Sequence, residues 1–351
     1  MRFGLPGGVT RFALPSVLAL FLLGCGPDFD PPSELHSLRV LAVQKDKPYA
    51  QPGDTVNLQM LWEDASLNVG RPVTIAWSAP CFDPPGDLYY LCFANKDLFG
   101  SSAPVLGDST SVTLLKEIIS QRTQPSQSRN APYGIAYVFF AACAGTLTAV
   151  APTSATAFPI GCKDDAGNLL GADDFVAGYT SVYSFDGFSN NNPEISGFEV
   201  DGKTIAADAF CQDTDCIAQA GSSVPDPDTI DCSTDDPRCI PTCAADGDRS
   251  CKGWSVHPVL DKDAKANQDT DEVSSTLVGR HLGEQMWINY YTDAGSFKSP
   301  VRLLNDASTG WNDDYGAEFY APKAAGMVRI WGVVHDNRGG ASWAGVTLKV
   351  E

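Results

Sequence analysis

The stretch that decides the fold class is residues 38–62, LRVLAVQKDKPYAQPGDTVNLQMLW. A short apolar run over residues 38–43 is followed by turn-forming residues at 51–54, and apolar side chains then alternate with others from Val56 to Trp62. A period of two is typical of a β-strand with one face in a core. The stretch therefore predicts two strands at the start of a β-rich fold.

Similar patterns continue along the chain. Residues 134–142 are rich in Tyr, Val and Phe, as expected for a strand buried on both faces, whereas residues 112–119 fit a strand or a short helix equally well. Asp201-Gly202 is a hairpin signal. Further strand-like segments lie at 73–77, 195–200, 254–260, 285–291, 301–304, 327–334 and 346–350. Many short strands without a long amphipathic helix predict an all-β protein with a sandwich in each half.

The first 25 residues have the three-part layout of a secretory signal. Residues 1–11 carry two arginines and no acid, residues 12–23 are apolar, and Gly24-Cys25 follows. An apolar segment of about a dozen residues is shorter than the roughly 20 needed for a membrane-spanning helix. We therefore expect cleavage.

The end of this segment, Leu22-Leu23-Gly24-Cys25, resembles the lipobox of bacterial lipoproteins, although Leu23 replaces the smaller residue usual there. The resemblance implies cleavage before Cys25 and a lipid on its sulfur. The alternative is an ordinary cleaved signal that leaves Cys25 as a half-cystine. Gly26 follows the cysteine, so the expected location is the outer membrane, facing either the periplasm or the cell surface.

Composition divides the remaining chain into two patterned regions. Residues 26–34 contain three prolines and three acids, which suits an extended tether, and Asn190-Asn191-Asn192-Pro193 separates the two regions. The predicted organisation is a lipoprotein signal peptide at 1–24, a lipidated tether at 25–34, a first sandwich at 35–189, and a second at 190–351 with a cysteine-rich acidic insert at 207–253.

Three segments resemble bacterial immunoglobulin-like modules. Residues 38–43 with 49–54 are similar to the opening of such modules, Trp77 falls where they often carry a core tryptophan, and residues 333–350 are similar to their final hairpin. Residues 158–162 and 175–179 resemble segments of uncharacterised tandem-domain lipoproteins of Gram-negative bacteria. The resemblance implies two immunoglobulin-like β-sandwiches in an envelope lipoprotein, and it implies no activity.

Of the 11 cysteines, lipidation of Cys25 would leave an even ten, which suits five disulfides in an oxidising compartment. In the first half Cys81 with Cys92 and Cys143 with Cys162 are the natural pairs. The six cysteines of the insert allow fifteen pairings, among which the sequence does not choose. Short spacing favours Cys211 with Cys216, Cys232 with Cys239, and Cys243 with Cys251.

Residues 201–272 hold 16 acidic and six basic residues. Several acids lie near the cysteines of the insert and offer the hard oxygens that calcium prefers: Asp226, Asp228, Asp231, Asp246 and Asp248. The alternative is a solvated acidic surface. Residues 261–272 have the spacing of an EF-hand loop, but Lys265 and Ala266 disrupt it, so we treat that match as coincidence. No paired CxxC motif supports zinc.

A net charge of -19 argues against nucleic-acid binding, and the four histidines are isolated. The sequence has no GxSxG, GxxxxGK[ST] or strand-linked GxGxxG motif, so we predict no enzyme. The leading hypothesis is a non-catalytic, membrane-anchored envelope lipoprotein that displays its sandwiches for adhesion, recognition or a structural role. Its insert and its loop at 336–340 would contact a protein or polysaccharide partner.

The alternative is a carbohydrate-binding or carbohydrate-active surface protein, dependent on calcium if the acidic site exists. It depends on the aromatic residues of the second half, because residues 286–291 place Trp287 and Tyr291 on one strand face and Tyr290 on the other. Either these aromatics fill a sandwich core or one set is exposed and stacks on sugar rings.

Overall fold

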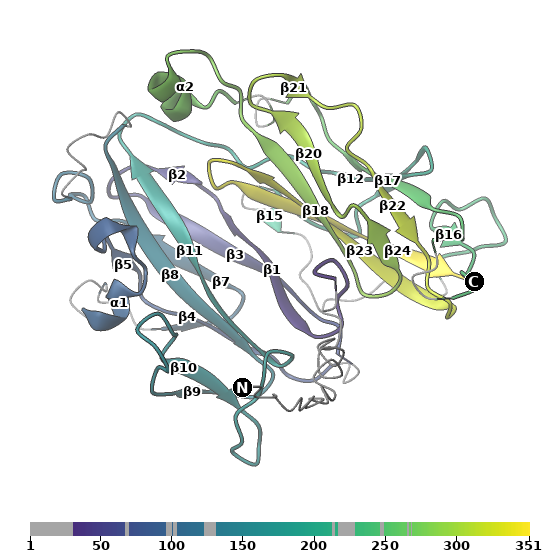
Figure 1. Cartoon of the computed structure of the whole chain (residues 1–351), viewed down its shortest axis with the longest axis horizontal. Coiled ribbons are helices and arrows are strands. Elements are labelled where there is room, and N and C mark those ends of the chain that lie inside the picture. The colour runs from purple at the N-terminus through teal and green to yellow at the C-terminus, as the bar shows by residue number, and fades with distance from the viewer. Residues whose placement is uncertain are drawn as a thin grey trace, which may run out of the picture. The chain divides into compact units, whose positions relative to one another are not determined.

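The computed structural model describes residues 31–66, 70–95, 100, 104–122, 131–212, 215–216, 229–245, 249–264, 267 and 269–351, with the backbone alone at 209–212 and 215–216. Its strands form five sheets, and four of these pair into two β-sandwiches (Figure 1). The predicted all-β fold class is therefore confirmed.

The first sandwich packs a three-stranded sheet against a six-stranded sheet. The smaller sheet has the order β1 (Leu38–Lys45), β3 (Thr55–Asp64), β7 (Ser109–Thr113). The larger has the order β2 (Tyr49–Ala50), β11 (Phe175–Phe185), β8 (Tyr133–Cys143), β4 (Thr74–Trp77), β6 (Val105–Leu106), with β5 (Cys81–Phe82) also paired to β8. Beside it lie the hairpin of β9 (Thr146–Ala149) and β10 (Ile160–Lys163) and the short helices η1 (Pro85–Asp87) and α1 (Leu91–Ala94).

The second sandwich packs a five-stranded sheet against an eight-stranded sheet. The first of these has the order β13 (Lys203–Ala206), β12 (Gly197–Val200), β17 (Trp254–Val259), β22 (Ala317–Tyr320), β19 (Ser296–Lys298). The other has the order β15 (Asp215–Cys216), β14 (Ala209–Gln212), β24 (Ala341–Val350), β23 (Gly326–Asp336), β18 (Met286–Thr292), β20 (Val301–Asp306), β21 (Gly310–Trp311), with β16 (Cys239–Ile240) paired to β24. A single helix of two turns, α2 (Glu272–Val278), precedes β18 in this described part.

Both sandwiches have the strand order of an immunoglobulin-like fold. In such folds strands A, B and E share one sheet, and strands C, F and G share the other. These places are taken by β1, β3 and β7 facing β4, β8 and β11 in the first sandwich, and by β12, β17 and β22 facing β18, β23 and β24 in the second. Trp77 lies on the strand that corresponds to C and is 1% exposed, as the resemblance implies.

Local sequence explains several of these elements. Val56, Leu58 and Met60 all point into the core, which follows from the period-two alternation. Asp201 and Gly202 both have positive φ, which the two-residue turn between β12 and β13 requires. The segment that was ambiguous from sequence is a strand up to Thr113, followed by turns.

Candidate functional site

Residues Pro32–Glu351 fold as one compact unit, and the two sandwiches meet along an apolar seam. Leu61, on β3, lies on the opposite face from the core residues of its own strand and is fully buried against the second sandwich. The members of this seam are Leu35, Leu41, Ala42 and Leu61 from the first half, and Trp331, Val333 and Trp343 from the second.

This seam decides between the two interpretations of the second-half aromatics. Tyr290 faces the sandwich core, while Trp331 and Trp343 are at most 1% exposed in the seam, with Tyr291 packed against them. Trp287 is half-buried and stacks on His335, with ring centroids 5.4 Å apart. Of the face left open as a possible aromatic row, Tyr291 is therefore packed in the seam and Trp287 is stacked on His335.

A buried ion pair crosses the seam. Arg329 Nη1 donates to Glu63 Oε2 at 2.7 Å, and Trp331 Nε1 donates to the same oxygen at 3.3 Å. Both charged residues are 8% exposed. The backbone N–H of Arg329 also donates to Asp293 Oδ1 at 2.8 Å, and burial raises the pKa of Asp293 to about 6. The partners of this ion pair come from β3 of the first sandwich and β23 of the second, so the pair helps to fix the orientation of one sandwich against the other.

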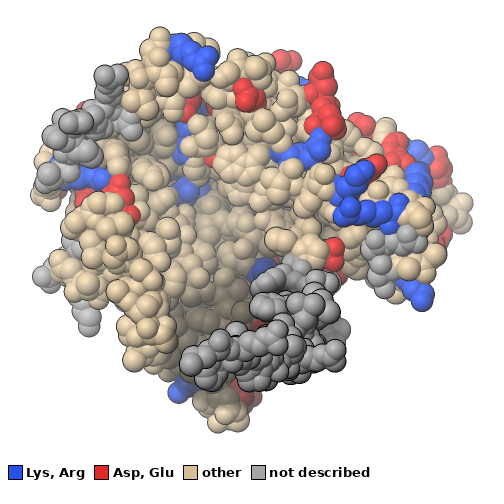
Figure 2. Space-filling view, viewed as in Figure 1, with Lys and Arg blue, Asp and Glu red and all other residues tan. Residues whose placement is uncertain are grey.

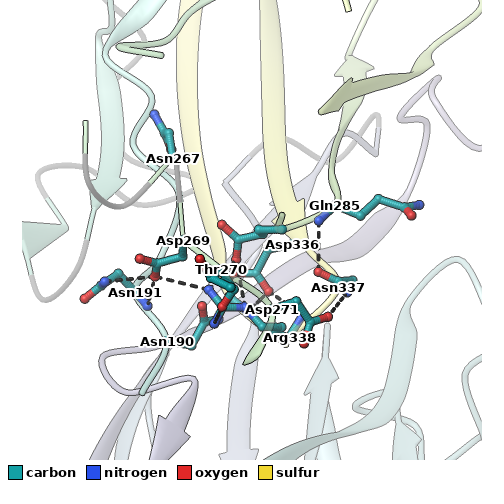
Figure 3. A network of polar contacts seen from close by, with 12 residues as sticks. Asn190, Asn191, Asn267, Asp269, Thr270, Asp271, Gln285, Asp336, Asn337 and Arg338 are labelled. Atoms are coloured by element: carbon teal, nitrogen blue, oxygen red, sulfur yellow. Dashed lines mark hydrogen bonds and ion pairs between the residues drawn. The ribbon is translucent and has the colours of Figure 1, made fainter. Parts of the chain in front are cut away.

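At one end of the seam a network of buried polar groups centres on the turn between β23 and β24 (Figure 3). Asp336 Oδ1 accepts hydrogen bonds from the backbone N–H groups of Arg338, at 2.7 Å, and Gly340, at 2.8 Å. Asp336 Oδ2 accepts one from Asn190 Nδ2 at 2.9 Å. The carboxylate therefore shapes its own turn and holds the segment that connects the sandwiches.

The guanidinium of Arg338 is the cation of this network. Its Nη2 lies 3.0 Å from Glu284 Oε1 and 3.1 Å from Asp269 Oδ2, and its Nη1 donates to the carbonyl of Thr270 at 3.1 Å. Its side chain is 3% exposed. Asp336 and Arg338 of the loop at 336–340 are buried against other segments of the same chain, whereas Asn337 is exposed, so contact of this loop with an external partner stays a prediction.

Glu284 holds a proton in this network. Burial raises the pKa of this carboxyl to about 9; the nearby charge of Asp336 also raises the pKa, and Arg338 lowers it. Its Oε2 is buried and has no hydrogen-bond partner in the described part of the chain, which disfavours a negative charge on this carboxyl. The neutral form of Glu284 is therefore favoured beside the charge of Asp336.

Three consecutive asparagines attach the connecting segment to this network. Asn190 donates to Asp336, and Asn191 Nδ2 donates to Asp269 Oδ2 at 3.0 Å. Asn192 Nδ2 donates to the carbonyl of Lys45 in the first sandwich at 2.7 Å, while its Oδ1 accepts from the N–H of Ala341 in the second at 3.0 Å. The residues whose composition indicated a boundary are thus the joint between the sandwiches.

Residues of the broken EF-hand pattern also serve this joint. Asn267 Oδ1 accepts from the backbone N–H of Glu194 at 2.9 Å, and Asp269 binds Asn191 and Arg338. A polar recess with a volume of about 490 Å³ adjoins Asp269 and Arg338. Protein groups already pair with both residues, so Asp269 and Arg338 hold segments of the chain together beside this recess.

Four disulfides have described side chains, and they join the pairs that short spacing favours: Cys81–Cys92, Cys143–Cys162, Cys232–Cys239 and Cys243–Cys251. Cys211 and Cys216 face each other across the β14–β15 pairing, but their side chains lie outside the described residues, as does all of Cys25.

Of the calcium candidates, Asp226, Asp228, Asp246 and Asp248 lie outside the described residues. Asp231 Oδ1 accepts hydrogen bonds from the N–H of Ser233 at 2.9 Å and from its hydroxyl at 2.6 Å. Within the described ranges, no three His, Cys, Asp or Glu side chains gather closely enough to hold a metal ion.

Sequence reasoning missed Glu284 and the buried role of Arg338. One signal was present: a charged turn, 335–340, sits between two strands that are otherwise almost wholly apolar. None of the helices described here has both the length and the apolar character needed to cross a membrane.

Comparisons with known proteins assign no family. No family model matches this chain, and no curated protein matches it. Among solved structures, Clostridium thermocellum CbhA fibronectin(III)-like modules are 11% identical with a TM-score of 0.17, covering 88% of this chain and 93% of that one. A mutant of Salmonella alpha-2-macroglobulin is 11% identical with a TM-score of 0.20, covering 92% and 17%. Three N-terminal domains of the bacteriophage RB49 outer capsid protein Hoc are 8% identical with a TM-score of 0.14, covering 90% and 99%. These similarities are too low to support an argument, so the fold assignment rests on the strand order alone.

Proposed function

We propose that this chain is a non-catalytic, lipid-anchored envelope protein that presents two immunoglobulin-like sandwiches as one rigid body for adhesion or recognition. The observation that carries the proposal is the set of buried contacts that join the two sandwiches, which we call the joint. An apolar seam, the Glu63–Arg329 ion pair, and the hydrogen bonds from Asn192 to Lys45 and from Arg338 to Ser189 all connect the two sandwiches. Such a joint favours display, because a protein that holds a binding surface away from a membrane gains reach and orientation from rigidity.

The positions of the perturbed titratable groups also support a non-catalytic role. Enzymes place such groups in open clefts, where substrate reaches them. Here the carboxyls of Glu284 and Asp293 are buried in the joint and the seam. His335 stacks on Trp287, and burial lowers its pKa to about 4, so its ring is neutral at pH 7.

The anchor is proposed from the sequence. The segment Leu22-Leu23-Gly24-Cys25 and the resemblance to tandem-domain lipoproteins of Gram-negative bacteria both support a lipid on Cys25. The proposed location is the outer membrane, and the proposed partner is a protein or polysaccharide of the envelope or its surroundings.

Cell fractionation tests the anchor. The full chain, tagged after Glu351, is expected in the outer-membrane fraction, and its Cys25→Ser variant is expected to lose that association. Equal membrane association of the two proteins would refute lipid anchoring. Protease treatment of intact cells then locates the sandwiches: cleavage places them at the surface, and protection until the outer membrane is broken places them in the periplasm.

Limited proteolysis of the purified protein tests the rigidity of the joint. A joint that holds the sandwiches together is expected to protect the segment at 186–195 from limited proteolysis in the purified protein. The Arg338→Met variant leaves Asp269, Glu284 and Asp336 without their cation, so cleavage within 186–195 is expected to become faster. Rapid cleavage of the unmodified chain at this segment would contradict a rigid display role.

A further inference from the structure

A pocket in the first sandwich is unrelated to the joint. It has a volume of about 420 Å³ and lies between β4, β8, α1 and the β9–β10 hairpin, which Figure 1 shows next to one another. This volume is within the range of about 300–1,000 Å³ typical of small-molecule sites. None of the described residues that line it is charged, in a chain with 67 charged residues.

Aromatic rings form much of the wall. Trp77 and Phe140 also line the pocket, but their rings pack in the sandwich core, on the opposite face of the sheet from Phe139. Phe93, Phe139 and Phe158 contribute from outside that core, and their centroids lie between 4.8 and 5.9 Å apart. These rings present both faces and edges, which is the geometry that a further ring can join.

The pocket offers few polar contacts. The hydroxyl of Ser78 donates to the carbonyl of Ala79 at 2.7 Å and accepts from the N–H of Phe139 at 3.2 Å, so the protein already uses it. The hydroxyl of Thr148 makes no hydrogen bond with the part of the chain that the structure describes, and is available to a ligand. A charged ligand would lose its hydration without finding a charged partner among the described lining residues, which makes its binding unfavourable.

Two disulfides hold the outer walls in place. Cys81–Cys92 ties α1, and with it Phe93, to β5 beside the sheet. Cys143–Cys162 ties β10, and with it Ile160, to the end of β8. The surface over α1 carries no Lys, Arg, Asp or Glu in Figure 2. The two segments that cover the pocket are thus covalently fixed, and the cavity is formed in advance of any ligand.

We propose that this pocket binds an uncharged, ring-bearing apolar small molecule. The absence of charge selects a neutral ligand, the aromatic walls favour rings, and fixed walls favour a rigid ligand because little flexibility is lost on either side. The site does not depend on the lipid anchor or on the joint.

The test uses N-phenyl-1-naphthylamine, a neutral fused-ring compound that fluoresces in apolar surroundings. The protein is the full chain with Cys25→Ser, which carries no lipid and needs no detergent. We expect saturable binding at one site per chain. Leu147→Glu places a charge in the pocket and is expected to weaken binding by at least about tenfold. Thr146→Glu is the matched control, because Thr146 is exposed on the same strand and does not line the pocket; its affinity is expected to be unchanged.

A second variant tests the aromatic walls without adding a charge. Phe158→Leu keeps an apolar wall but removes one ring, so the affinity for the probe is expected to fall by about threefold to tenfold. Linear, unsaturable fluorescence would overturn the proposal, as would equal affinities of Leu147→Glu and Thr146→Glu. The proposal would also be overturned if hexadecanol displaced the probe with a higher affinity than neutral ring compounds do, because the pocket would then be assigned to acyl chains.

Discussion

Above neutral pH, the Glu284→Gln variant should have a higher free energy of unfolding than the unmodified chain. In the folded protein burial raises the pKa of Glu284 to about 9, whereas the ordinary value of 4.5 applies to the unfolded chain. The unfolded chain therefore releases this proton near pH 4.5, and the folded protein keeps it until about pH 9. Stability from this group is fully present below pH 4.5 and is lost as the pH rises towards 9. An amide cannot ionise, yet its oxygen still accepts a hydrogen bond from Arg338, as Glu284 Oε1 does.

The window from pH 6.5 to pH 8 isolates this effect. The pKa of Asp293, raised to about 6, and that of His335, lowered to about 4, change stability mainly below pH 6.5. The pKa of Lys45, lowered by burial to about 8, changes it mainly above pH 8. One pH unit corresponds to about 1.4 kcal/mol for one proton, so the window of 1.5 units should lower the free energy of unfolding by about 2 kcal/mol through Glu284 alone.

Urea denaturation of the unmodified chain and of Glu284→Gln, at several pH values across this window, measures the effect. We expect the variant to gain about 2 kcal/mol relative to the unmodified chain between the two ends of the window. Glu117→Gln is the control for the substitution itself, because Glu117 is exposed in a turn. Parallel pH profiles for Glu284→Gln and the unmodified chain would refute the raised pKa of Glu284.

Two further predictions concern the seam. Arg329→Met leaves Glu63 buried without its cation and should lower the free energy of unfolding by about 3–5 kcal/mol; adding Glu63→Gln should restore most of this loss in urea denaturation, and no restoration would contradict the ion-pair account. Gly345→Ala would place a Cβ 2.4 Å from the ring of Trp331 and should cost about 1–3 kcal/mol, whereas Gly171→Ala, with nothing within 4 Å, should leave the melting temperature unchanged.

The sandwiches could be predicted because their signals are local. Alternation along residues 56–60 fixes which side chains face a core, and Asp201-Gly202 fixes a turn. Short spacing also favoured the pairs that the four described disulfides form, since cysteines 7 to 19 residues apart meet easily across a hairpin or turn.

The joint could not be predicted, because its members come from distant segments. Lys45, Asn192, Asp269, Glu284 and Arg338 are each unremarkable in their own neighbourhoods, and only tertiary packing brings them together. Alternation shows which strand face is apolar but not what covers it. For that reason Trp331 and Trp343 were open to two interpretations, and the sequence did not indicate that Asp336 and Arg338 in the loop at 336–340 are buried.

The seam has a consequence for the order of events during synthesis. The buried seam residues of the first sandwich end at Leu61, whereas those of the second sandwich begin only at Trp331. A nascent chain emerges from its N-terminus, so the first sandwich can form while the surface around Leu61 and Glu63 still has no cover. A chaperone that shields this surface until the last strands arrive would therefore increase the yield, and loss of the final 25 residues would leave a protein that folds in part and aggregates through the same face.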